Sequence, residues 1–412
     1  MADRGIRRER DGGLVYDNHV PVFRKTPVAQ ARKKLNFKFI KSGVDKPFLI
    51  LILVLLVFGI IMMFSASFAW GINDEGDGYF YARKQMIFAA VGLGVMTVVS
   101  FLDYHFYQNT KICYLFFGVT YGMTVYAALF GSSTADASRW IVLGPIQFQP
   151  SEILKVAFII IFAYIMSVNF PHFDKSWKYC VIPFTVIMGM VAGVLMLQRH
   201  LSAVLIVGVI GVSMMFVSGM PRATFWKFIG FCAAAVGIVA LYFVITGSGF
   251  SYISERIESW RNPTSDPQGS TYQTYNSLLA IGSGGWTGLG FGESRQKYLY
   301  LPEAQNDFVF SVICEELGFV GAVVVVLLFV IFVLRGFYIA SHAKDRFGML
   351  VAAGITIQIG IQAFLNIMVA SNAFPNTGIS LPFFSYGGTA LMIQLAEMGI
   401  LLNISRQGSI QK

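Results

Sequence analysis

The sequence KPFLILILVLLVFGIIMMFSAS, residues 46–67, decides the fold class, because it carries no charged residue after Lys46. A helix of about 20 apolar residues crosses the hydrocarbon core of a bilayer. Backbone groups in lipid must be hydrogen-bonded within their own segment, so such a run is expected to form a helix. With this run, the apolar segments lie at residues 48–69, 86–102, 112–130, 152–169, 179–197, 201–218, 225–246, 308–334, 348–370 and 385–404. The chain is therefore predicted to be an all-α integral membrane protein with about ten transmembrane helices.

The composition of the whole chain agrees with this prediction. Hydrophobic residues make up 55% of the 412 residues and charged residues only 13%, whereas soluble domains carry roughly 25% charge. So few charges cannot cover a water-facing surface, which excludes a soluble enzyme. The sequence has neither the spacing of zinc or iron ligands nor a Walker A motif.

The distribution of basic residues predicts how the chain crosses the membrane. Residues 1–47 are polar and basic and are predicted to form a cytoplasmic, mostly disordered tail. With that tail inside, the short inner loops hold more Lys and Arg residues than the short outer loops, as the positive-inside rule requires. We expect a membrane domain over 48–406, a C-terminus over 407–412, and both termini in the cytoplasm. The net charge of +9 then indicates anionic membrane lipids as partners, not nucleic acid.

Two connections between the predicted spans are unusual. Residues 247–307, between the seventh and eighth spans, are rich in Gly, Ser, Tyr and Trp. Long segments of this kind are often functional, so we expect a large ordered extracellular loop. Residues 198–200 separate the fifth and sixth spans and form either a tight hairpin or the mouth of a re-entrant segment.

The first polar outer segment is SRWIVLGPIQFQPSEILK, residues 138–155, which leads into the fourth span. Glu152 and Lys155 are three residues apart and so share one helix face at membrane depth, where charges face a partner or a polar cavity. Two interpretations stay open. Glu152 and Lys155 form a self-neutralising pair, or Lys155 and Arg139 present cations to an anionic ligand.

The second segment is LPEAQNDFVF, residues 301–310, in which Asp307 directly precedes the eighth span. Partial burial at this boundary is expected to raise the pKa of the Asp307 carboxyl group, and such a carboxylate can act as a general base. Asp307 could equally cap the helix. Glu315 and Glu316 follow about two turns later. A buried pair of glutamates indicates a polar cavity, a proton path or a hydrogen-bonded strut between helices.

The third segment is SNAFPNTGISLPFFSYGGTAL, residues 371–391, which contains Ser385 and is followed by Glu397 in the last span. Irregular backbone at membrane depth is tolerated only where it lines a cavity or is buried in protein. We therefore expect Ser385 and Glu397 to line a polar cavity.

Taken in this order, the motifs resemble the bacterial SEDS family (shape, elongation, division and sporulation), which includes RodA, FtsW and SpoVE. The resemblance covers residues 46–406 and includes YQTYNSLLAIGSGGWTGLGFGESRQKYLYLPEAQNDFVFSVICEELGFVG, residues 272–321. The opening run and the closing EMGILLNISR, residues 397–406, are more similar to the FtsW/SpoVE branch than to RodA.

The resemblance implies a peptidoglycan glycosyltransferase of the bacterial plasma membrane that serves division, elongation or sporulation. Its substrate would be lipid II, an undecaprenyl-diphosphate-linked disaccharide-pentapeptide, and its partner a class B penicillin-binding protein. The essential aspartate of the family falls on Asp307. The family often has HTD where this chain has Gln305-Asn306-Asp307. It often has an acidic residue near residues 198–202, which read QRHLS here, so any role of that carboxylate is in doubt.

Such a reaction needs a base for the attacking hydroxyl group and cations for the departing diphosphate. Asp307 is the expected base, and Glu152 is expected to orient Lys155 or Arg139. A bound divalent cation such as magnesium or manganese is a candidate helper. The candidate substrate-binding residues are Arg139, Glu152, Lys155, Arg256, Arg261, Gln273, Arg295, Lys297 and Glu303.

Two rival hypotheses remain from the residues. A lipid II flippase would use Glu315, Glu316 and Glu397 for a proton-coupled path, but it needs a polar route to both membrane faces. A non-catalytic scaffold for division or sporulation proteins would have no need of Asp307.

Overall fold

The structure is a computed structural model that describes residues 15–17, 20–22, 43–134, 137–143, 146–173, 178–198, 200–246 and 250–408. The predicted tail, residues 1–47, lies outside the described residues up to residue 42, apart from strands β1 (Val15–Asp17) and β2 (Val20–Val22), which pair antiparallel. Of the predicted C-terminal segment, only residues 407 and 408 are described. The prediction of a disordered tail is therefore not tested.

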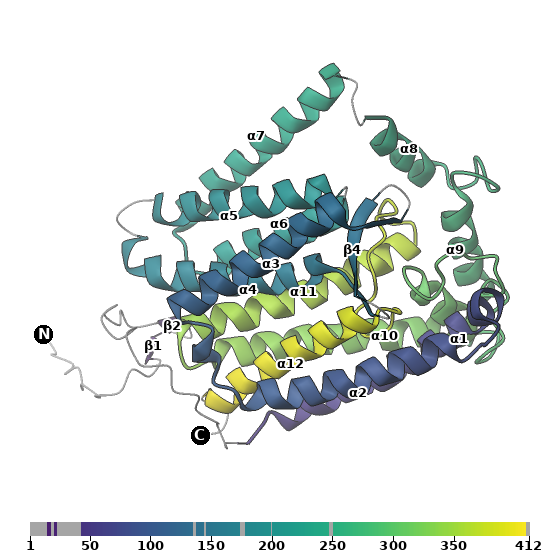
Figure 1. The fold of residues 1–412 in the computed structure, drawn as a ribbon, viewed down its shortest axis with the longest axis horizontal. Coiled ribbons are helices and arrows are strands. Elements are labelled where there is room, and N and C mark those ends of the chain that lie inside the picture. The colour runs from purple at the N-terminus through teal and green to yellow at the C-terminus, as the bar shows by residue number, and fades with distance from the viewer. Residues whose placement is uncertain are drawn as a thin grey trace, which may run out of the picture.

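Long helices run side by side and form a bundle (Figure 1). They are α1 (Lys46–Glu75), α2 (Phe80–Phe101), α3 (Thr110–Phe130), α4 (Pro150–Asn169), α5 (Lys178–Leu197), α6 (Leu201–Val217), α7 (Arg222–Thr246), α10 (Val309–Ser341), α11 (Arg346–Ala370) and α12 (Gly388–Gln407). Among the described residues, eight helices are long and apolar enough to cross a membrane. The prediction of a multi-pass helical membrane protein is confirmed. The count of about ten spans stays a prediction, because α6 is shorter than those eight and α7 is not among them.

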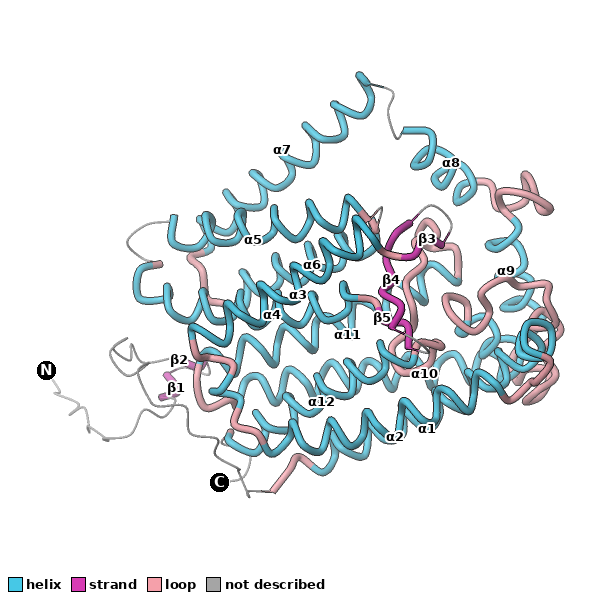
Figure 2. Tube along the Cα trace, in the orientation of Figure 1, coloured by secondary structure: helices cyan, strands magenta, loops and turns pink. Residues whose placement is uncertain are grey.

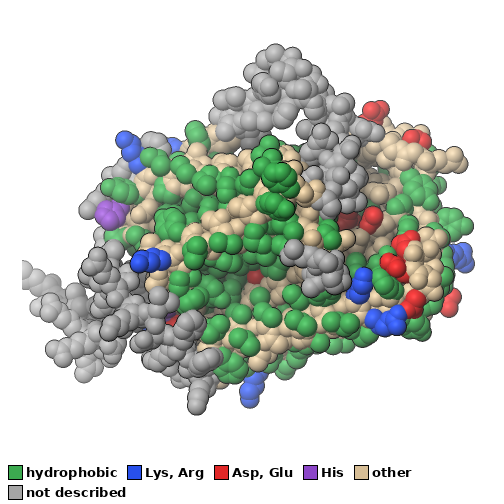
Figure 3. Space-filling view, in the orientation of Figure 1, with side chains coloured by type: hydrophobic (Ala, Val, Ile, Leu, Met, Phe, Trp, Pro, Cys, Tyr) green, Lys and Arg blue, Asp and Glu red, His purple; other side chains and the backbone are tan. Residues whose placement is uncertain are grey.

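The surface of the bundle is adapted to lipid. Leu115, Phe130 and Leu334 are 67%, 71% and 65% exposed although they lie on long helices. Water would not tolerate so many exposed apolar side chains, whereas hydrocarbon does. Hydrophobic side chains cover much of the middle of the visible face, and acidic side chains gather at one end (Figure 3).

The core lies around α11, which packs against α4, α6 and α10, while α12 lies along α2. Aspartates fix where two of these helices begin. Asp45 precedes α1 and accepts a hydrogen bond from the backbone N–H of Phe48 at 3.0 Å. Asp345 precedes α11 and accepts one from Gly348 at 2.8 Å. Each satisfies a backbone donor that a helix start would leave unpaired.

Of the two interpretations of residues 198–200, the tight hairpin is favoured, since α5 ends at Leu197, α6 begins at Leu201 and the two helices pack together. Short 3-10 helices, η2 (Tyr104–Phe106) and η3 (Phe170–His172), lie in two other connections. We call the end of the bundle that holds this hairpin and residues 371–387 the loop end. The end where α1 begins and α12 finishes is the terminal end (Figure 1).

Two features of the loop end were not predicted. The loop at 247–307, which was predicted to be large and ordered, contains two helices that the sequence analysis did not predict, α8 (Phe250–Arg261) and α9 (Tyr272–Ser283). Between α3 and α4, strands β3 (Ser132–Thr134), β4 (Ala137–Leu143) and β5 (Ile146–Phe148) form an antiparallel sheet (Figure 2). The β-branched and aromatic residues of RWIVLGPIQF and its Gly-Pro pair are the sequence signal that could have predicted this sheet.

Candidate active site

Asp307 lies at the loop end, between the polar segment 297–306 and the start of α10. Its backbone carbonyl accepts a hydrogen bond from Asn366 Nδ2 at 2.7 Å. Its Oδ2 atom lies against Gly378, where an added Cβ would be only 3.3 Å away. The predicted capping role is not observed. Phe308 is the residue at the cap of α10, and no side-chain cap bond is made there. Among the described residues, no hydrogen bond or ion pair ends on the Asp307 carboxylate.

The environment of this carboxylate makes it a better base than an ordinary aspartate. Burial raises the pKa of Asp307, and the negative charge of Glu303 raises it further. The positive charges of Arg139 and Arg256 act in the opposite direction, and the result is a pKa of about 7. Asp307 can therefore accept and release a proton near neutral pH, as general acid–base catalysis requires.

Two arginines from different elements of the loop end act on Asp307. Arg139, on β4, donates from Nε to the carbonyl of Gln198 at 3.3 Å. Arg256, on α8, donates to the carbonyl of Asn376. Both backbone carbonyls belong to segments between helices, so these two hydrogen bonds help to fix the positions of the guanidinium groups. Both arginines were predicted as substrate-binding residues, and their electrostatic effect on the pKa of Asp307 indicates that they lie near it.

Lys155 and Glu152 form the predicted pair, with 2.9 Å between Lys155 Nζ and Glu152 Oε2. The Lys155 side chain is only 3% exposed, and a buried cation needs such a partner. The structure therefore contains the Glu152–Lys155 pair. The second interpretation, in which Lys155 and Arg139 present cations to an anionic ligand, stays open, because the positive charge of Lys155 also acts on His200. Burial and the positive charges of Arg139 and Lys155 lower the pKa of His200 to about 3. A neutral imidazole therefore occupies a region where the family often has an acidic residue.

A buried polar stripe runs from Asp307 into the bundle along α11. Asn366, Gln362 and Gln358 are four residues apart on α11 and so share one face. Each has an amide oxygen with no hydrogen-bond partner among the described residues. Gln358 Nε2 donates to Glu397 Oε1 at 2.7 Å. Glu397 is thus buried and hydrogen-bonded, and the prediction that it lines a polar cavity stays a prediction. The three amides were missed, although polar residues at this spacing in an apolar run are a visible signal.

A pocket of about 220 Å³ adjoins Asp307 on the side of α8 and α9. It is connected to Asp307 through the segment 376–378, since the Gly378 amide donates to Asn376 Oδ1 at 3.2 Å. The predicted residues Arg256 and Gln273 both line it. The full lining is Arg256, Ser259, Trp260, Ser270, Gln273, Thr274 and Asn376. It is mostly neutral and hydrogen-bonding, and the fold brings it together from three separate segments, which is why sequence reasoning did not find it.

Other predicted residues lie elsewhere. Lys297 is buried, and its ammonium group donates to Glu316 Oε1, Ser65 Oγ and the Gly292 carbonyl. All three donors of this lysine are used, which favours a structural role over the predicted diphosphate binding. Arg261 and Arg295 are exposed, and within the described part of the chain no hydrogen bond or ion pair joins either side chain to the surroundings of Asp307.

Glu303 and Ser385 support the segment before Asp307. Asn306 Nδ2 donates to Glu303 Oε2 at 2.5 Å. Ser385 Oγ donates to the Asn306 carbonyl and accepts from the Leu381 amide at 2.7 Å. Ser385 thereby fixes the backbone beside the base. Glu315 and Glu316 are buried and hydrogen-bonded, which agrees with the predicted strut.

The described side chains do not form a metal site of their own. Within the described ranges, no three His, Cys, Asp or Glu side chains come close enough together to hold one. The divalent cation predicted as a helper has no observed ligand set here, and no step below is assigned to it.

A bundle of long apolar helices with a charged, polar site at one end defines a multi-pass α-helical membrane protein. The chain belongs to the family described as cell cycle protein, FtsW/RodA/SpoVE, whose model matches residues 46–410. The predicted family is therefore confirmed.

Relatives and solved structures agree with the family. A protein named probable peptidoglycan glycosyltransferase FtsW from Geobacter sp. (strain M18) is 36% identical over 88% of this chain and 97% of its own length. Stage V sporulation protein E of Bacillus subtilis (strain 168) is also 36% identical, over 89% and 98%. A chain of a peptidoglycan synthase complex that coordinates polymerization and crosslinking has a TM-score of 0.69 at 26% identity, over 88% and 98%. The rod shape determining protein RodA of Thermus thermophilus has a TM-score of 0.64 at 25% identity, over 89% and 98%.

Proposed function

We propose that this protein is a peptidoglycan glycosyltransferase that polymerises lipid II, with Asp307 as its general base. The observation that carries the assignment of the base is the Asp307 carboxylate, which has no bonded partner among the described residues. It lies between the charges of Arg139 and Arg256, and its pKa is raised to about 7. Relatives named as peptidoglycan glycosyltransferases support the reaction class.

Each of these residues has a role in a single glycosyl-transfer step. A sugar hydroxyl of the acceptor attacks the anomeric carbon of the donor, and its proton passes to Asp307. A new C–O bond forms while the bond from the anomeric carbon to the lipid diphosphate breaks. The leaving diphosphate carries the negative charge away, and Arg139 and Lys155 are the cations proposed to stabilise it. Glu152 orients Lys155 through their ion pair.

The pocket beside α8 and α9 suits the sugar part of a substrate. Its lining offers hydroxyl, amide and indole groups from Ser270, Gln273 and Trp260 together with one arginine. Neutral donors and acceptors of this kind pair with sugar hydroxyls, whereas a diphosphate favours a site with several cations. We place a saccharide ring in this pocket and the diphosphate on the Arg139 side of Asp307.

The orientation follows from the substrate and the charge distribution. We propose that the loop end faces the outside of the plasma membrane, where lipid II is polymerised, and that both termini lie in the cytoplasm. The bias of basic residues toward the terminal end supports this orientation. It requires an even number of spans, and ten spans with α6 and α7 included satisfy that requirement.

A class B penicillin-binding protein is the proposed partner. A structural neighbour belongs to a peptidoglycan synthase complex that coordinates polymerization with crosslinking. A polymerase of this family is therefore expected to work beside a transpeptidase that crosslinks its product.

The test is polymerisation of labelled lipid II in detergent by the purified protein together with its partner. Wild type should make long glycan chains and Asp307→Asn none, because an amide cannot take the proton. Asp74→Asn is the matched control, since Asp74 is an exposed carboxylate that bonds to Tyr81, and this variant should polymerise like wild type. Equal polymer from wild type and Asp307→Asn would refute the assigned base. No polymer from wild type, although the substrate is accessible in detergent, would favour the flippase hypothesis.

A further inference from the structure

Helix α10 is interrupted close to the loop end, and the glycine-rich segment 284–292 supplies the backbone hydrogen bonds that the interrupted helix cannot make within itself. Gly318 has φ 66° and ψ −164°, which no helix contains. The carbonyls of Glu315 and Glu316 therefore accept from the amides of Leu289 and Gly290, at 2.9 and 3.1 Å. In the opposite direction, the amides of Phe319 and Val320 donate to the carbonyls of Gly285 and Trp286, at 2.9 and 3.2 Å. Carbonyls and amides that a regular helix would pair internally are thus satisfied by the loop.

These backbone hydrogen bonds require glycine in both segments, at Gly288 in the loop and at Gly318 in α10. An added Cβ at Gly288 would lie 2.1 Å from the carbonyl oxygen of Glu316, and one at Gly318 would lie 2.3 Å from the amide nitrogen of Gly288. Both residues also have positive φ. The close approach of the two backbones therefore depends on residues without a side chain.

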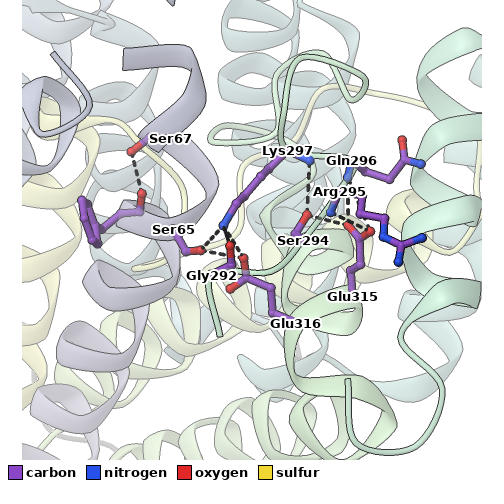
Figure 4. A network of polar contacts seen from close by, with 10 residues as sticks. Ser65, Ser67, Gly292, Ser294, Arg295, Gln296, Lys297, Glu315 and Glu316 are labelled. Carbon is purple, nitrogen blue, oxygen red and sulfur yellow. Dashed lines mark hydrogen bonds and ion pairs between the residues drawn. The ribbon is translucent and has the colours of Figure 1, made fainter. Parts of the chain in front are cut away.

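The side chains of Glu315 and Glu316, next to the interruption, bind different parts of the chain. Glu315 accepts from Ser294 Oγ at 2.5 Å and from the Arg295 amide at 3.0 Å. Glu316 accepts from Lys297 Nζ at 2.8 Å and from Ser65 Oγ at 2.6 Å. Figure 4 shows Lys297 reaching between α1 and α10 to meet both groups. We call Ser65, Ser294, Lys297, Glu315 and Glu316 the loop-closing network.

The loop-closing network fixes the start of the segment that carries Asp307 to α10. Residues 294–297 are bound to Glu315 and Glu316, and the same chain returns into α10 through Asp307 and Phe308. Both ends of the segment 294–315 are therefore tied to one turn of α10. Within it, Leu301, Ala304 and Phe308 are buried, while Leu299 and Glu303 adopt positive φ. Such strained positions persist only where surrounding contacts enforce them.

We propose that the Lys297–Glu316 ion pair is a positioning device for the catalytic base: with Glu315 it closes the segment 294–315 and ties it to α1 at Ser65. These residues touch no substrate and act through the position of Asp307. The inference rests on the proposed function, in which Asp307 accepts the proton.

The effect of the ion pair on catalysis can be separated from its effect on the stability of the fold. A buried ion pair often contributes little net stability, and replacement of both charges by neutral groups of similar size is frequently neutral. Lys297 and Glu316 are 3% and 0% exposed. If the pair served only the fold, removal of both charges would leave catalysis intact. If it positions Asp307, catalysis falls although the protein still folds.

The experiment compares the full-length protein with its partner in four forms: wild type, Lys297→Met, Glu316→Gln and the double variant. kcat and KM for lipid II, the pH dependence of kcat/KM and the thermal unfolding temperature are measured. We expect the double variant to unfold near the wild-type temperature while its kcat falls about 10- to 100-fold, the range for a misplaced catalytic group. KM should change little. The acid-side midpoint should move below about pH 7, because a looser segment exposes Asp307 to water.

The matched control is Arg335→Met. Arg335 also lies on α10 and its Nη2 pairs with Asp45 Oδ2 at 2.8 Å, but at the terminal end. This variant is expected to lower the unfolding temperature without moving the midpoint of the pH profile. The same change of the profile in Arg335→Met would overturn the proposal, because any loosening of α10 would then suffice.

Two further outcomes decide the matter. If kcat and the pH midpoint of the double variant stay within about twofold and 0.2 pH units of wild type, a scale on which a positioning effect would be evident, the network is only a strut. If the double variant does not fold, Ser294→Ala replaces it, since it removes one hydrogen bond to Glu315, and an unchanged kcat overturns the proposal. An active Asp307→Asn variant would instead refute the proposed base and leave the closure of the loop untouched.

Discussion

The raised pKa of Asp307 predicts the pH dependence of the enzyme. With a pKa of about 7, roughly half of the carboxyl groups are ionised at pH 7 and about a tenth at pH 6. Only the ionised form accepts the proton, so kcat/KM should fall about tenfold per unit below pH 7. An aspartate with an ordinary pKa of 3.8 would give a flat profile over the same range.

Glu303→Gln tests the physical cause of this shift. Glu303 lies four residues before Asp307, whose amide donates to the Glu303 carbonyl at 3.0 Å, and its negative charge raises the pKa of Asp307. Two unit charges roughly 6 Å apart interact by about 0.7 kcal/mol in bulk water and about 2.8 kcal/mol at an effective dielectric constant of 20, or about 0.5 to 2 pKa units. Because Glu303 is exposed, we expect the lower end, about 0.5 units.

The assay is the rate of lipid II polymerisation between pH 5 and 8, at substrate concentrations below KM. The midpoint should lie near pH 7 in wild type and lower in Glu303→Gln. Glutamine retains an oxygen for the hydrogen bond from Asn306, so the local geometry is kept. Glu258→Gln, which removes an exposed carboxylate from α8, should leave the midpoint in place. A flat wild-type profile down to pH 5, or a midpoint that rises in Glu303→Gln, would refute the reasoning.

Two further changes test the fold that supports the site. Gly288→Ala should abolish or severely lower stable expression, because Gly288 has φ +82° and no room for a Cβ; Gly282→Ala, where space is open, is the control, and equal thermal stability of the two variants would contradict the expectation. At the terminal end, burial alone would lower the pKa of His105, but hydrogen bonds to Asp103 and Asp345 raise it to about 9. The charged imidazole therefore contributes stability that is complete below about pH 6.5, its ordinary pKa, and is lost as the pH rises through about 9. The difference in unfolding temperature between wild type and His105→Gln should shrink over that window, and a difference that grows toward pH 9.5 would contradict this assignment.

Several parts of the site could be predicted from the sequence, and each has a local cause. Asp307 was found because a carboxylate beside an apolar run is desolvated wherever the rest of the chain lies. Glu152 and Lys155 were predicted as one possible pair because three residues bring side chains together on any helix. The family resemblance added the reaction, since a local pattern alone could not distinguish a base from a helix cap.

Other parts required the tertiary structure. The sequence placed Lys297 among cations for a diphosphate, but burial beside Glu316 and Ser65 uses all of its donors. The pocket of about 220 Å³ joins Gln273 to Asn376, which are far apart along the chain. No periodicity predicts such a contact, because it depends on how α8 and α9 pack over the segment between α11 and α12.

By itself, the sequence determined that this protein is a bundle of membrane-spanning helices with a polar loop end. The reason is that hydropathy over about 20 residues settles whether a segment can cross a bilayer, whatever its neighbours are. The tertiary structure decided which charges from distant parts of the chain meet. From the sequence, Glu315 and Glu316 could belong to a cavity, a proton path or a strut. The structure gives each carboxylate its partners, Ser294 for Glu315 and Lys297 with Ser65 for Glu316. A buried charge is stable only beside the groups that compensate it, and for these residues those groups come from distant parts of the chain.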